Sequence, residues 1–65
     1  MAKQRTTYTV NVERGLNVRE KPTTKAKVLA VLNNGDKVKA DTEREGASGW
    51  LPVLGGGYVM TEYLK

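Results

Sequence analysis

Cysteine and histidine are both missing from this 65-residue chain. Without cysteine there is no disulfide and no thiolate metal site, so apolar packing and backbone pairing must hold the fold. A nucleophile with its base, or a metal, is what a catalytic site usually requires. Paired carboxylates would need a cleft that so short a chain can scarcely build, except at an interface between copies. We therefore expect no enzyme activity, no catalytic residues, no metal and no cofactor.

Long apolar runs are also missing. No stretch approaches the roughly 18 residues of a membrane span, so we expect no membrane partner. The polar residues 1–7 have no apolar run behind their charges and do not resemble a signal peptide. We expect a flexible tail over 1–7 and a single domain over 8–65. Its location stays open: cytoplasmic if Met1 is the natural start, or cell wall and extracellular if the domain comes from a hydrolase.

An excess of one charge sign is present but small. Lysine and arginine total 11 against 7 aspartate and glutamate, which gives a net charge of +4. A basic balance favours an acidic partner, such as an anionic polymer, a nucleic acid or an acidic protein face. Charges of both signs are scattered along the chain, however, and a scattered basic surface is often no more than a solvated one. Both interpretations remain open.

Apolar and polar residues alternate over several short segments, which is the pattern of half-buried strands. The alternating segments are 8–12, 16–19 and 37–41, and further short strands are expected over 27–32, which is rich in strand-forming residues, 50–54 and 58–60. Such closely spaced short strands, with no convincing helix, are typical of a small barrel or sandwich, and a barrel removes exposed edges. The expected core residues are Val10, Leu16, Val18, Val28, Leu32, Val38, Val53, Val59 and Leu64.

Local sequence signals predict three further features. Asn33-Asn34-Gly35-Asp36 contains Asn-Gly, the strongest short hairpin signal, and predicts a hairpin over residues 27–41. Near the C-terminus, 61–64 is expected to form one helical turn with Thr61 as its cap. The stretch 20–26 is polar, contains a proline and has no apolar period, so it is predicted to be an exposed loop.

Several fixed points recur in one order along the chain. They are Leu16-Asn17-Val18-Arg19, Pro22, the 27–38 stretch with Gly35, Gly49-Trp50, and the closing segment 57–64. This order and spacing resembles the bacterial SH3 domain (SH3b, the SH3 type 3 group) over about residues 8–65. The resemblance implies an all-β, SH3-like barrel of five to seven short antiparallel strands. One departure is Gly57-Tyr58, where many members carry a second Gly-Trp.

The resemblance also implies a ligand groove walled by the loop at 20–26. The residues expected to bind ligand there are Arg19, Pro22, Trp50, Tyr58 and Tyr63. Bacterial SH3 domains often accompany cell-wall hydrolases, where they are thought to hold the enzyme on peptidoglycan, and others contact proteins. We therefore expect a non-catalytic module that recognises a cell-wall peptide or glycan, or a protein peptide, and that is a monomer if it is part of a larger chain.

Other interpretations stay open at this point. Trp50 could complete the core instead of lining a groove, Tyr63 could be a packing residue, and Arg19 could pair with a local acid such as Glu20 or Glu43. The chain could also be a basic nucleic-acid-binding barrel, which its charge would suit. A third possibility is a stand-alone phage or plasmid accessory protein that acts as an oligomer.

Overall fold

The computed structural model describes residues 6–65, and its regular structure is almost entirely β. The elements are β1 (Thr7–Thr9), β2 (Leu16–Arg19), β3 (Val28–Leu32), β4 (Lys37–Lys39), β5 (Trp50–Pro52), β6 (Tyr58–Met60) and the 3-10 helix η1 (Thr61–Tyr63). Within residues 6–65 no helix has the length and apolar character to cross a membrane. Of the expected tail, residues 1–5 lie outside the described part, and Thr7 already belongs to β1.

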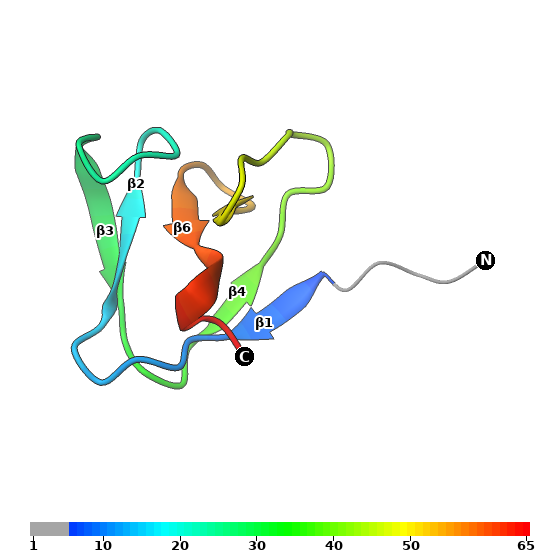
Figure 1. Ribbon diagram of the computed structural model, residues 1–65. Coiled ribbons are helices and arrows are strands. Elements are labelled where there is room, and N and C mark those ends of the chain that lie inside the picture. The colour runs from blue at the N-terminus through cyan, green and yellow to red at the C-terminus, as the bar shows by residue number, and fades with distance from the viewer. Residues whose placement is uncertain (1–5) are drawn as a thin grey trace.

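The strands form two antiparallel sheets, a four-stranded one in the order β3-β2-β6-β5 and a two-stranded one of β1 and β4. Figure 1 shows the β2–β3 pair on one side of the molecule and the β1–β4 pair on the other, with β6 between them. Two seams join the sheets, through the bridges Val10↔Leu64 and Ala40↔Val53. The result is a small barrel, as the strand pattern predicts.

The turn between β3 and β4 is present, but the two strands do not pair with each other. β3 pairs with β2 and β4 pairs with β1, so the predicted hairpin over residues 27–41 is wrong. In the turn, the Asp36 N–H donates to the Asn33 carbonyl at 3.0 Å, and Gly35 has a φ of 91°. A tight hairpin turn of type I′ needs positive φ at both central residues, and here only Gly35 has one. The two strands therefore splay into different sheets.

The core is small and made mostly of valine. Its buried members among residues 6–65 are Val10, Leu16, Val18, Val38 and Val59. Leu32, Val53 and Leu64 are partly buried against this cluster, as predicted. Val28 is 41% exposed, so its assignment to the core is wrong. It lies opposite Arg19, whose side chain is on the outer face of β2, and its own side chain therefore points away from the core.

The C-terminal helical turn forms as η1, but its cap differs from the prediction. The residue at the cap position is Met60, and no side chain bonds to the first turn, so Thr61 is not the cap. The Thr61 N–H instead donates a hydrogen bond to the Gly49 carbonyl at 2.9 Å. This bond places η1 beside the start of β5, and so brings Tyr63 to the same region of the molecule as Trp50.

Gly57 is the position at which the packing of β6 against β2 leaves no room for a side chain. Its φ is +88°, and a Cβ there would lie 2.5 Å from Val18 Cγ1 and 3.1 Å from the Arg19 carbonyl oxygen. We expect Gly57→Ala to lower the free energy of unfolding by about 3 kcal/mol, from left-handed strain and overpacking together. Urea unfolding measures the loss.

Gly55 provides the matched control in the same turn. Its φ is +99°, but apart from its chain neighbours no heavy atom lies within 4 Å of the position that a Cβ would take. Gly55→Ala should therefore show only the conformational cost, about 1–2 kcal/mol. Equal losses in the two variants would contradict the packing account.

Candidate binding groove

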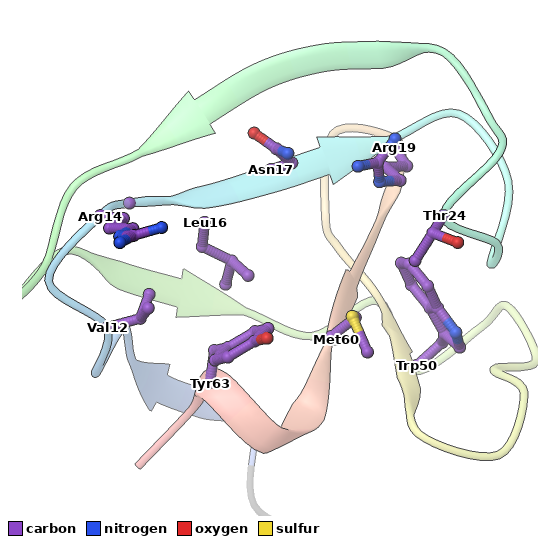
Figure 2. A pocket seen from close by; sticks show the side chains of 10 residues that line it. Val12, Arg14, Leu16, Asn17, Arg19, Thr24, Trp50, Met60 and Tyr63 are labelled. Atoms are coloured by element: carbon purple, nitrogen blue, oxygen red, sulfur yellow. The ribbon is translucent and has the colours of Figure 1, made fainter.

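A groove with a volume of about 320 Å³ runs along the outer face of β2 towards the start of β5. Its lining residues are Val12, Arg14, Gly15, Leu16, Asn17, Arg19, Thr24, Trp50, Met60 and Tyr63. Figure 2 shows Arg14 at one end of the groove and Trp50 with Thr24 at the other. Leu16, Tyr63 and Met60 lie between the two ends. The groove therefore has an apolar middle and two chemically different ends.

The alternation of β2 supplies one side of the groove. Leu16 and Val18 are buried, whereas Asn17 is exposed and Arg19 half-buried. Because successive side chains of a strand point to opposite faces, Asn17 and Arg19 share the outer face. One strand thus contributes both to the core and to the wall of the groove.

Arg19 holds the loop at 20–27 against β2. Its Nη1 donates to the Ala26 carbonyl at 3.0 Å, and the Glu20 N–H donates to the Lys27 carbonyl at 2.9 Å across the base of the loop. This side-chain bond goes to a backbone carbonyl and not to Glu20 or Glu43, the acids considered from the sequence. The loop is thereby held where Thr24 lines the groove beside Trp50 (Figure 2).

Trp50 is half-buried at the start of β5. Its backbone N–H donates to the Ala47 carbonyl at 2.9 Å, and in the sheet Trp50 is paired with Met60. The backbone position is therefore defined from both sides, while the indole lines the groove. A partly exposed indole offers a large apolar face for stacking together with a ring N–H donor.

Tyr63 reaches the groove from η1. Its side chain is half-buried and packs against the core, and its carbonyl accepts the Asn11 N–H at 2.8 Å. The residue thus combines the packing role and the groove role that the sequence left as alternatives. Among the residues expected from the sequence, the structure brings Arg19, Trp50 and Tyr63 together in one groove.

Pro22 and Tyr58 are outside the lining of this groove. The ring of Tyr58 is covered by Arg44, whose guanidinium carbon lies 5.1 Å from the ring centroid. Arg44 is held there by the Val53 carbonyl, the Gly57 carbonyl and Asp41, which accepts from its Nε at 2.9 Å. Its hydrogen bond lowers the pKa of the Asp41 carboxyl, helped by the Glu43 backbone N–H. The face of the Tyr58 ring is therefore occupied by Arg44 of the same chain.

The charge of the groove has one sign. Among the described residues that line it, Arg14 and Arg19 are the two cations, and none is an aspartate or a glutamate. Elsewhere along residues 6–65, no three metal-binding side chains gather in one place. The chemistry present in the groove is therefore that of two guanidinium groups, two aromatic rings, a thioether and small polar groups.

Among the lining residues that were not predicted from the sequence, four differ in whether the sequence carries a signal for them. Asn17 carries a usable signal, because it is two residues from Arg19 on the same strand. Met60 needs the β5–β6 register, which places it opposite Trp50. Arg14 and Thr24 lie in connections, where no periodicity tells which way a side chain points.

The fold and the groove together define the chain as a small all-β barrel of the SH3-like class. A family model described as "Bacterial SH3 domain" matches residues 14–65. The chain belongs to the bacterial SH3 domain family, as the resemblance of its motifs indicates. Comparison with curated proteins gives no match. Domains of this kind are generally binding modules.

Removing the guanidinium of Arg19 tests its role in holding the loop. In Arg19→Gln the bond to the Ala26 carbonyl is lost, and we expect amide hydrogen exchange over 20–27 to quicken by about fivefold, from loss of about 1 kcal/mol. Arg14→Gln, at the exposed end of the groove, should leave this exchange unchanged. Unchanged exchange in Arg19→Gln would show that the loop is held by its backbone bonds alone.

Proposed function

We propose that this domain is a non-catalytic binding module whose groove recognises a short peptide that carries a carboxylate, with the peptides of cell-wall peptidoglycan as the first ligand class to test. The observation that supports this most is the composition of one groove: Trp50 and Tyr63 beside two arginines, with no acidic residue. Family membership supports the binding role in general terms.

The size of the groove favours a small ligand segment. Its volume of about 320 Å³ is near the lower end of the range of ligand pockets, which is roughly 300–1,000 Å³. A short stretch of peptide fits this space, whereas a folded partner would need a wider surface. The apolar middle and the indole would hold the body of the ligand, because partly buried aromatic rings contribute much of the contact energy in such sites.

The charge of the groove favours an anionic group on that ligand. A guanidinium offers five N–H donors in a fork that matches a carboxylate, and the Arg14 side chain is exposed at the end of the groove. Stem peptides of peptidoglycan carry carboxylates and are extended, which suits both features. We propose that the carboxylate lies at Arg14 and the remainder of the peptide runs towards Trp50.

Trp50 gives the first test. In a pull-down on purified peptidoglycan, we expect the wild-type domain to be retained and Trp50→Ala to lose most of its retention, because the stacking face is removed. A hot-spot aromatic contributes about 2 kcal/mol or more to binding, which is roughly a thirtyfold change in affinity. Leu54→Ala is the matched control, since Leu54 is 61% exposed and outside the groove.

The same proteins separate the competing functions. Both variants must first show wild-type thermal unfolding, so that lost binding is not lost folding. If neither wild type nor Leu54→Ala is retained on peptidoglycan, the cell-wall ligand is excluded. A titration with single-stranded oligonucleotide at two salt concentrations then tests the nucleic-acid alternative, which requires binding that weakens as salt rises.

Arg14 gives the test of the carboxylate. We expect Arg14→Gln to weaken binding of a soluble stem peptide with free carboxylates by about tenfold, because a charge-assisted bond of about 1.5 kcal/mol is lost. Calorimetry measures the change. Lys39→Gln removes the same charge from the exposed face of β4 and should leave the affinity unaltered. If both variants weaken binding equally, only the net charge of the domain matters.

A further inference from the structure

Strand β3 is an apolar sheet edge. It is the first strand in the order β3-β2-β6-β5, and along residues 6–65 it pairs only with β2. The strand reads Val28-Leu29-Ala30-Val31-Leu32 and carries no charged side chain. Alternate residues of an edge strand direct their N–H and C=O groups away from the sheet, where another strand can pair with them.

The exposure of this strand is unusual for the molecule. Among residues 6–65, the exposed large apolar side chains are Val28 at 41%, Leu29 at 49%, Val31 at 58% and Leu54 at 61%, and three of these four belong to β3. Natural proteins protect such edges with lysine, proline or bulges placed within the strand. Here the protection within the strand is limited to the register shift opposite Val18 and Arg19.

The flanking charges favour one arrangement of a second copy. Lys25 and Lys27 precede β3, whereas Asn33 and Asp36 follow it. If two β3 strands pair antiparallel about Ala30, the lysines of each copy face the 33–36 turn of the other and approach its Asp36. Parallel pairing would stack like lysines about 4.8 Å apart, which is unfavourable.

We propose that β3 is a self-pairing edge, through which two copies of this chain join antiparallel into one continuous sheet. The partner that fits is a second copy, because both the apolar sequence and the end charges of β3 are complementary to themselves under a two-fold axis. An interface of one short strand is small, so the dimer is weak and depends on protein concentration.

The pairing has a consequence for the groove, and this consequence alone rests on the proposed function. A two-fold axis perpendicular to the sheet keeps the outer faces of both β2 strands on one side. The two grooves would then face the same way, and a polymeric ligand could occupy both. Two linked sites bind a repeating ligand more tightly than either site alone, without any new contact.

Sedimentation velocity of the full chain without ligand tests the pairing. We expect the weight-average molar mass to rise from 7.2 kDa towards twice that value as the protein concentration approaches the millimolar range. Val31→Lys places a charge on the free edge and should raise the dissociation constant at least about tenfold. Leu54→Lys adds the same charge to an equally exposed site outside β3 and should change it by no more than about twofold.

Amide hydrogen exchange provides the second measurement, which does not need a variant to fold. Alternate amides of β3 should gain protection as wild-type concentration rises, while those of β5 should not. A wild type that stays monomeric at every concentration, equal effects of the two lysine variants, or no change in β3 protection would each overturn the proposal. Because no ligand is present, these outcomes are independent of whether the groove binds peptidoglycan.

Discussion

The position of β2 between β3 and β6 is the constraint on which the rest of the structure depends. With both of its edges paired, the strand cannot rotate, and its two faces have fixed roles. Leu16 and Val18 belong to a core cluster with five buried members in the described part of the chain, while Asn17 and Arg19 face the groove. A slip of one residue would exchange these faces, and so would remove the core and the groove together.

Two arginines use the same chemistry with opposite results. Each donates from its guanidinium to backbone carbonyls: Arg19 to Ala26, and Arg44 to Val53 and Gly57. Arg19 thereby fixes a loop at the side of the groove, where Trp50 remains available. Arg44 instead covers Tyr58 and engages its ring. Which aromatic can meet a ligand is therefore decided by where the neighbouring arginine finds its carbonyl acceptors.

The sequence was sufficient for the fold class and for part of the groove. Alternation placed Leu16 and Val18 in the core and Arg19 outside it, because the period of a strand is a local property. It failed where a partner strand decides the outcome: the Asn-Gly turn exists, yet β3 pairs with β2, and Val28 is exposed. The covering of Tyr58 by Arg44 depends on a loop path that no local pattern encodes.

We propose that the preformed groove between Arg14 and Trp50 is the ligand site of this domain. An NMR titration of the isotope-labelled chain with soluble peptidoglycan peptides tests it most directly. The account predicts that the largest shift changes occur at the Trp50 indole N–H and at the amides of Asn17 and Thr24. Shift changes centred on Tyr58 and Arg44, or no shift changes at a large excess of peptide, would contradict it.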